Sequence, residues 1–153
     1  MLFKTHVVFG LFLYLILFSY VESPWFFLLG VMVGSILVDI DSKNSKVGNY
    51  FLLRPLQFFM KHRGRIHSLF FGFIVMVVVA IFHAWLAFGF MVGFLGHLLL
   101  DSLTKQKIML FWPLFKTKFG FSLVKSGGII ETIVFVVLLF IDLLLIVYHV
   151  ALV

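Results

Sequence analysis

The sequence contains no cysteine, so it can form neither a disulfide bond nor a thiolate metal site. Charged residues are also scarce: they make up 12% of the 153 residues, against about a quarter in a soluble domain. A water-soluble surface cannot be built from so few charges. The chain is instead 63% hydrophobic, with 22 phenylalanines and a mean hydropathy of +1.22. This composition predicts an integral membrane protein.

Apolar runs predict an all-α fold of about five short transmembrane helices in a single multi-pass domain over residues 1–153. A spanning helix needs about 17–25 residues. Residues 7–21, 24–40 and 128–153 come close to or reach this length. The run of residues 68–100 would make one helix of about 50 Å, so we expect it to form two helices that turn near residues 83–87.

Small and polar residues inside these runs indicate where helices pack. Glycines four residues apart allow two helices to approach closely. A charge near the bilayer centre is costly, so Asp142 is expected to face the protein interior as a packing residue rather than to line a pathway. The glycines that mark such packing faces are Gly30, Gly34, Gly89, Gly93 and Gly96.

All twelve Lys and Arg residues fall on one side of the five-helix arrangement, before the first helix or in the loops of residues 41–67 and 104–127. The positive-inside rule makes this side cytoplasmic, with the N-terminus there, in the plasma (inner) membrane. The net charge of +6 therefore reflects topology and contact with anionic membrane lipid, and no nucleic-acid partner is expected.

The first of these loops contains a pattern typical of an amphipathic helix in the membrane interface. Arg54, Gln57 and Lys61 repeat at helical spacing, and phenylalanine and leucine residues lie between them. We expect an interfacial helix over residues 50–61.

The chain has six acids and six histidines, and eight of these are expected at the cytoplasmic ends of the helices. Clustered carboxylates repel one another unless cations neutralise them. Mixed imidazole and carboxylate ligands suit Zn²⁺, Mn²⁺ or Fe, and eight groups exceed one tetrahedral site, so two ions are plausible. The candidate metal ligands are His6, Asp39, Asp41, His62, His67, His97, Asp101 and Glu131.

Single members of this set also have ordinary structural interpretations. His97 and Asp101, one helical turn apart, could form an ion pair at a helix end. Ser68 could cap the third helix, and Glu131 could simply favour a helix N-terminus electrostatically. The gathering of eight such residues on one side favours the metal site over these separate interpretations.

Two metal ions suit the hydrolysis of phosphate esters, because they activate water and stabilise the leaving oxygen. Arg63 and Arg65 lie between two candidate ligands and could hold a phosphate, together with Ser68. Asp39 or Glu131 could accept a proton where it is not a ligand. The candidate catalytic residues are therefore Asp39, Glu131 and Arg63, and the candidate substrate-binding residues are Arg63, Arg65 and Ser68.

Several motifs occur in a familiar order between about residues 5 and 131. They are Thr5-His6 followed by Gly10, Asp39-Ile40-Asp41, His62-Arg63-Gly64-Arg65-Ile66-His67-Ser68, Gly96-His97-Leu98-Leu99-Leu100-Asp101, Phe111-Trp112-Pro113, and Gly127-Gly128 with Glu131. In these the sequence resembles the membrane-bound metal-dependent hydrolases, also described as LexA-binding, inner-membrane-associated hydrolases (YdjM-like). The resemblance implies the same eight polar residues as the site. Val38 replaces the family's usual proline, which affects the turn more than the chemistry.

The expected function is a metal-dependent hydrolase with a cytoplasm-facing site and one or two Zn or Mn ions, acting on a phosphoester of a lipid or amphiphile. Its partners would be membrane lipid and a phosphate-containing small molecule or lipid. One alternative is a small transporter, which would need polar residues across the bilayer, where only Asp142 qualifies. The other alternative is a non-enzymatic regulatory membrane protein that binds metal structurally.

The topology can be tested with reporter fusions. Reporters at Lys43 and Lys116 should both be cytoplasmic, and one at the C-terminus should lie outside, because five spans separate the two termini. Reporters at Lys43 and Lys116 on opposite sides of the membrane would contradict the five-helix arrangement.

Overall fold

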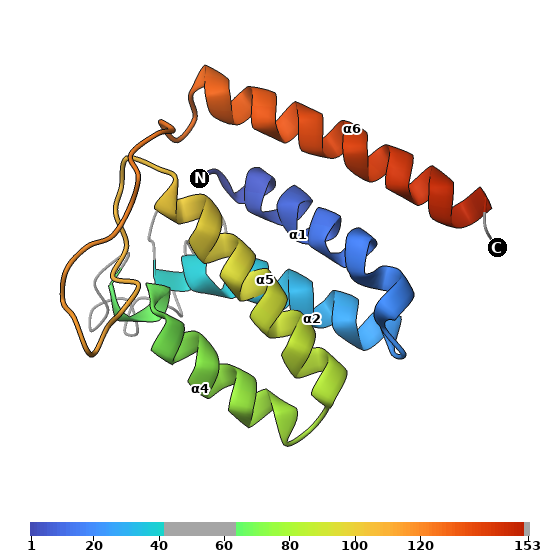
Figure 1. Ribbon diagram of the computed structural model, residues 1–153, viewed down its shortest axis with the longest axis horizontal. Coiled ribbons are helices and arrows are strands. Elements are labelled where there is room, and N and C mark those ends of the chain that lie inside the picture. Colours follow the sequence, from blue (N-terminus) through green and yellow to red (C-terminus); the bar gives the residue numbers. More distant parts are fainter. Residues whose placement is uncertain (42–63, 152–153) are drawn as a thin grey trace.

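The computed structural model describes residues 1–41 and 64–151 and contains the five predicted helices (Figure 1). They are α1 (Phe3–Leu17), α2 (Pro24–Leu37), α4 (Leu69–Ala80), α5 (Ala84–Ser102) and α6 (Ile129–Ala151). Short 3₁₀ turns follow α1 and α2 and precede α4, as η1 (Phe18–Tyr20), η2 (Val38–Asp41) and η4 (Arg65–His67). The all-α prediction is confirmed, and the predicted interfacial helix over residues 50–61 lies outside the described residues.

Within residues 1–41 and 64–151, three helical segments are long and apolar enough to cross a membrane: Phe3–Tyr20, Ala84–Ser102 and Ile129–Ala151. The other two helices are shorter, with 14 residues in α2 and 12 in α4. At about 1.5 Å per residue, α2 and α4 extend about 20 Å, less than the hydrocarbon core of about 30 Å. The fold is therefore that of an all-α membrane protein that combines three helical segments of spanning length with two shorter apolar helices.

The turn between α4 and α5 lies at residues 81–83, slightly before the expected position near residues 83–87. The Nδ1 atom of His83 accepts a hydrogen bond from the Leu86 backbone N–H at 3.4 Å, so His83 caps α5. Histidine is not among the residues that usually signal an N-cap. The helix α5 therefore begins earlier than the sequence predicts.

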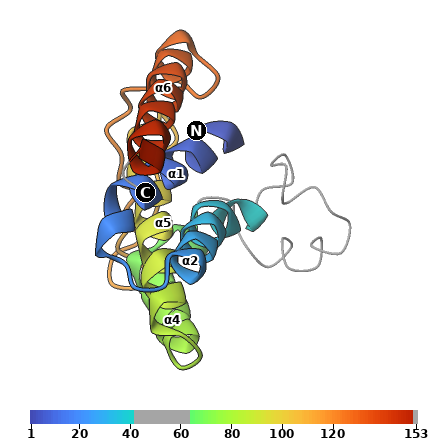
Figure 2. The ribbon, with the colours of Figure 1, turned by 90° about the vertical axis from the view of Figure 1, so that its right-hand side faces the viewer.

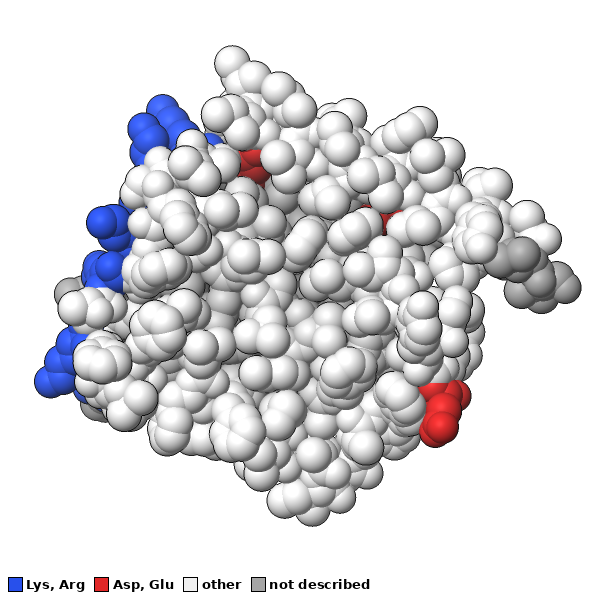
Figure 3. Space-filling view, in the orientation of Figure 1, with Lys and Arg blue, Asp and Glu red and all other residues white. Residues whose placement is uncertain are grey.

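The helices lie side by side in the order α6, α1, the α2–α5 pair and α4 (Figures 1 and 2). The first residues of α1, α4 and α6 and the last residues of α2 and α5 meet at one end of the bundle, on the left of Figure 1. We call this the polar end. The Lys and Arg residues visible on the face in Figure 3 gather there, while the helices that extend from it present apolar side chains.

The helices α2 and α5 run parallel, and glycines bring their backbones into contact. A Cβ atom added at Gly89 would overlap the carbonyl oxygen of Phe27, and one at Gly93 would overlap that of Val31. Gly34 of α2 is equally close to the α5 backbone. These contacts confirm the predicted packing faces. They also fix the register of the two helices, because residues four apart on α2, Phe27 and Val31, contact residues four apart on α5, Gly89 and Gly93.

Asp142 lies near the middle of α6, whose other side chains are largely exposed, yet its own side chain is only 1% exposed. Within residues 1–41 and 64–151, neither of its carboxylate oxygens has a hydrogen-bond partner. The helix α6 packs against α1. Asp142 therefore faces the protein and not the lipid, which agrees with the expectation of a packing residue.

The glycine register can be tested with two matched substitutions. Gly93→Ala should lower the free energy of unfolding by about 1–3 kcal/mol, because the new methyl group overlaps backbone that cannot move away. At Gly10 of α1, an added Cβ atom would lie 2.5 Å from the Ser35 hydroxyl oxygen, which can rotate away. Both substitutions gain the same helix propensity, so their difference reports packing. Equal thermal midpoints for the two variants in detergent would contradict the register.

Candidate metal centre

The polar end brings together five of the eight predicted metal ligands, and all five are buried. They form two groups that share His97, and in each group the candidate ligand atoms lie within 4.8 Å of one another. One group is His6, Asp39 and His97, and the other is His67, His97 and Asp101. His6 comes from α1, Asp39 from η2 and His67 from η4. His97 and Asp101 both come from α5.

Asp101, in the last turn of α5, is the point on which three imidazole rings converge. His6 Nε2 lies 3.4 Å from its Oδ1 atom, while His67 Nε2 and His97 Nε2 lie 3.5 and 3.7 Å from Oδ2. The amino group of Met1 lies 2.5 Å from Oδ1. The His6 and His97 rings stack with centroids 3.9 Å apart. Four nitrogen groups thus surround one carboxylate in the interior of the bundle.

The imidazole of His97 is oriented by the backbone of α2. Its Nδ1 atom lies 2.8 Å from the carbonyl oxygen of Ser35, which can only accept a hydrogen bond, so Nδ1 carries the proton. In the neutral ring the lone pair is then on Nε2, which points at Asp39 and Asp101. Among the described residues, this Nε2 atom has no hydrogen-bond partner. A backbone carbonyl that fixes the tautomer in this way is typical of metal-binding histidines.

The distances in the cluster suit ligands of a shared cation better than direct hydrogen bonds. The imidazole–carboxylate separations of 3.4–4.0 Å exceed the usual N–H···O range of about 2.7–3.2 Å. Two ligand atoms that each lie about 2.0–2.2 Å from one ion are at most about 4.4 Å apart. With ligand atoms within 4.8 Å of one another, each group could hold a metal ion once its side chains adjust.

Asp39, in η2, lies at the outer side of the cluster. Its Oδ1 atom is 4.0 Å from His97 Nε2. Burial raises the pKa of the Asp39 carboxyl above its ordinary value, and the neighbouring His97 opposes this rise. Burial in this position therefore disfavours the charged form of Asp39.

Glu131, in the first turn of α6, is buried but belongs to neither group. Its Oε1 atom accepts hydrogen bonds from the Leu2 backbone N–H at 2.5 Å and the Thr5 hydroxyl at 2.9 Å. Its Oε2 atom accepts one from the Gly127 backbone N–H at 2.6 Å. These contacts join the start of α6 to the start of α1. Glu131 thereby positions the turn of α1 that carries His6.

The remaining predicted site residues are placed differently. Ser68 is the N-cap of α4: its hydroxyl accepts from the Phe71 backbone N–H at 3.2 Å and donates to the Arg65 carbonyl at 2.6 Å. This confirms the capping interpretation. The Arg65 side chain is exposed, with its guanidinium 5.5 Å from the centre of the Trp112 ring. His62 and Arg63, and the side chain of Asp41, lie outside the described residues.

Sequence reasoning did not identify Ser35 as part of the site. The contribution of Ser35 is its carbonyl oxygen, a group that every residue has, so residue type carries no signal for it. The residue spacing does carry a signal. Ser35 follows Val31 by four residues, and His97 follows Gly93 by four. His97 therefore continues the row of α5 residues that contact α2 carbonyl groups.

The role of Glu131 can be separated from metal binding. Glu131→Ala would leave the Leu2 and Gly127 N–H groups and the Thr5 hydroxyl without this acceptor, at a cost of about 1–3 kcal/mol each if buried. We expect a lower thermal midpoint with unchanged metal content at saturation. Thr5→Val should lower the midpoint less, and Thr132→Val, on the exposed side of α6, should not change it. Loss of metal in Glu131→Gln, which keeps an acceptor oxygen for Leu2 and Thr5, would instead support the predicted ligand role.

Comparison with known proteins agrees with the membrane fold. The family model described as YdjM inner membrane protein matches residues 1–152. No curated protein and no solved structure matches the chain. The family description names a membrane and no reaction. With apolar helices of spanning length and a match over residues 1–152, the chain belongs to the YdjM inner membrane protein family.

Proposed function

We propose that the chain is a membrane-embedded metal-dependent hydrolase, with its site at the cytoplasmic face, that acts on a phosphoester of a lipid or amphiphile. The observation that carries this proposal is the buried cluster in which His97, held by the Ser35 carbonyl, presents its Nε2 atom to Asp39 and Asp101. His6 and His67 complete two ligand groups. Buried imidazoles and carboxylates at these distances are a ligand set that Zn²⁺ or Mn²⁺ would satisfy.

One or two such ions, when bound, would make water acidic enough to supply a nucleophile and would neutralise charge on a phosphate. The protein would supply the rest. His6, His67, His97 and Asp101 would hold the ions, and Asp39, at the outer side of the cluster, would accept the proton at its carboxylate where it is not itself a ligand. Glu131 is less suited to this last role, because both of its oxygens already accept hydrogen bonds.

The basic residues at the polar end support an anionic substrate. In the described part of the chain these are Lys4, Arg65, Lys105, Lys107, Lys116, Lys118 and Lys125. They raise the local concentration of anions and leave the metal ligands to recognise the phosphoryl group. Arg65 precedes the candidate ligand His67 by two residues, and Lys4 precedes His6 by two.

Metal analysis of the detergent-purified protein tests the proposal. The wild type should contain at least about one transition-metal ion per chain, or gain it on incubation with Zn²⁺ or Mn²⁺, because metal-activated water is the proposed nucleophile. His97→Ala should lower both metal content and phosphate release from phosphatidic acid in mixed micelles. His149→Ala is the matched control, since its Nδ1 atom bonds to Leu145 of its own helix, far along α6 from the polar end.

Unfolding of His97→Ala in the absence of metal would point to a structural metal and not to a catalytic one, so its helicity should be measured alongside. Wild-type protein that neither contains nor takes up a transition metal would falsify the hydrolase proposal.

A further inference from the structure

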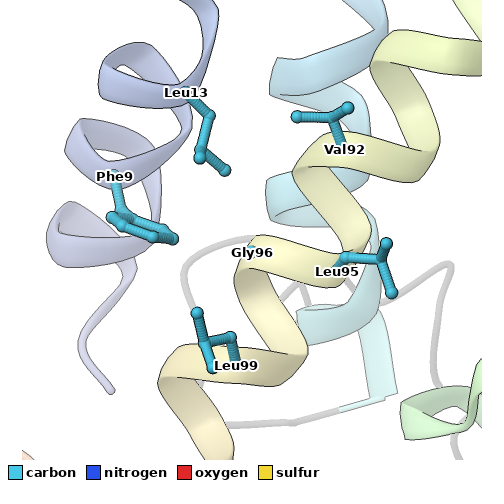
Figure 4. A pocket seen from close by; sticks show the side chains of 6 residues that line it. All are labelled: Phe9, Leu13, Val92, Leu95, Gly96 and Leu99. Atoms are coloured by element: carbon cyan, nitrogen blue, oxygen red, sulfur yellow. The ribbon is translucent and has the colours of Figure 1, made fainter. Parts of the chain in front are cut away.

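An apolar groove of about 430 Å³ lies between α1 and α5. Figure 4 shows Phe9 and Leu13 extending from α1 into the space between the two helices. The remaining lining residues all belong to α5 and are Val92, Leu95, Gly96 and Leu99. The lining contains no charged side chain and no side chain that can form a hydrogen bond. The groove therefore suits hydrocarbon and would not hold a polar molecule.

The groove opens toward the surroundings of the bundle. The side chains of Leu95 and Leu99 are 40% and 53% exposed. Both α1 and α5 belong to the segments long and apolar enough to cross a membrane, so these surroundings are lipid chains. Gly96 keeps the groove open, because a Cβ atom there would lie 2.7 Å from Leu13 Cδ1 and 3.2 Å from Phe9 Cε1.

The residues that line the groove lie close to two of the cluster histidines along α1 and α5, although no cluster residue belongs to the lining itself. On α1, His6, Phe9 and Leu13 are spaced by three and four residues, so the cluster histidine and the two groove residues share one face of the helix. On α5, Gly96 is next to His97, whose ring stacks on that of His6 with the centroids 3.9 Å apart. A chain in the groove would thus place its head group beside the ligands.

Charge at this end of the groove selects the head group. The basic residues of the polar end lie on the same side as the cluster (Figure 3). Lys4, in the first turn of α1, belongs to this end of the bundle, and its ammonium group lies on the α6 side of α1, 4.5 Å from the centre of the Phe135 ring. An anionic head group is complementary to this end, and an apolar chain is complementary to the groove.

We propose that the groove holds one hydrocarbon chain of an anionic lipid and presents the phosphate of that lipid to the cluster of His6, His97 and Asp101. This proposal rests on the proposed hydrolase function and names its substrate class as a phosphate-bearing membrane lipid. A chain that moves from the bilayer into the groove leaves one apolar environment for another, so the groove adds little affinity. Its contribution is to fix the depth and direction of the lipid, while the charged head group supplies the selectivity.

Photo-crosslinking tests the groove independently of turnover. The full-length protein is reconstituted in phosphatidylcholine vesicles with a small fraction of phosphatidic acid that carries a photoreactive diazirine on one acyl chain. After irradiation, the labelled residues are located by peptide mass spectrometry. Labels should concentrate on the groove residues of α1 and α5, and Val92→Trp, which fills the groove, should remove most of them. Val137→Trp, on the exposed side of α6, should leave the labelling unchanged.

Leu99→Trp provides a second test if Val92→Trp does not fold, because Leu99 lies at the exposed edge of the groove. Labels spread evenly over the exposed faces of α1, α4, α5 and α6 would overturn the proposal. Equal labelling of the groove by phosphatidylcholine with the same photoreactive chain would overturn it as well. Labelling requires neither bound metal nor hydrolysis. A protein without metal would therefore refute the hydrolase while the groove is still labelled, and a metal-loaded protein with an unlabelled groove would refute the groove alone.

Discussion

The close parallel approach of α2 and α5 is the constraint on which the rest of the structure depends. At three successive turns of α2, the carbonyl oxygens of Phe27, Val31 and Ser35 meet α5 at Gly89, Gly93 and His97. The first two contacts require the absence of a side chain. The third uses the same short separation for a hydrogen bond to an imidazole. Packing and site geometry are thus two outcomes of one register: the glycines that allow the helices to touch also orient the candidate metal ligand.

The other helices add ligands to this pair. The helix α1 contributes His6, whose ring stacks on that of His97, and the turn before α4 contributes His67. Glu131 ties the start of α6 to the start of α1 without entering either ligand group. Burial of several imidazoles and carboxylates in an apolar bundle is costly unless charge is neutralised and lone pairs are used. A bound cation resolves that cost, and this physical requirement is the main support for a metal at the polar end.

Much of this arrangement could be predicted from the sequence because the membrane restricts what a chain can do. Apolar run lengths predicted the five helices, and alternation of direction predicted that His6, Asp39, His67, His97 and Asp101 gather at one end. Sequence spacing could not distinguish the depth or rotation of each helix. Glu131 therefore looked equivalent to the other acids, although it faces α1 and not the cluster. The capping of α5 by His83 and the hydrogen bond at the Ser35 carbonyl could not be predicted from the sequence, because both depend on local geometry and not on residue type.

The register between α2 and α5 also determines where the chain can change its length. An insertion or deletion of one residue turns every later side chain of a helix by about 100°. Between Gly30 and Asp39, or between Gly89 and Asp101, such a change would carry the ligands away from the cluster while the helix itself remained intact. The segment from residue 103 to residue 128 is free of this helical constraint, because it forms isolated bridges and turns, and only single residues in it, such as Thr104, Ile108 and Val124, are buried. Related chains should therefore differ in length in that loop and keep these two helical intervals unchanged.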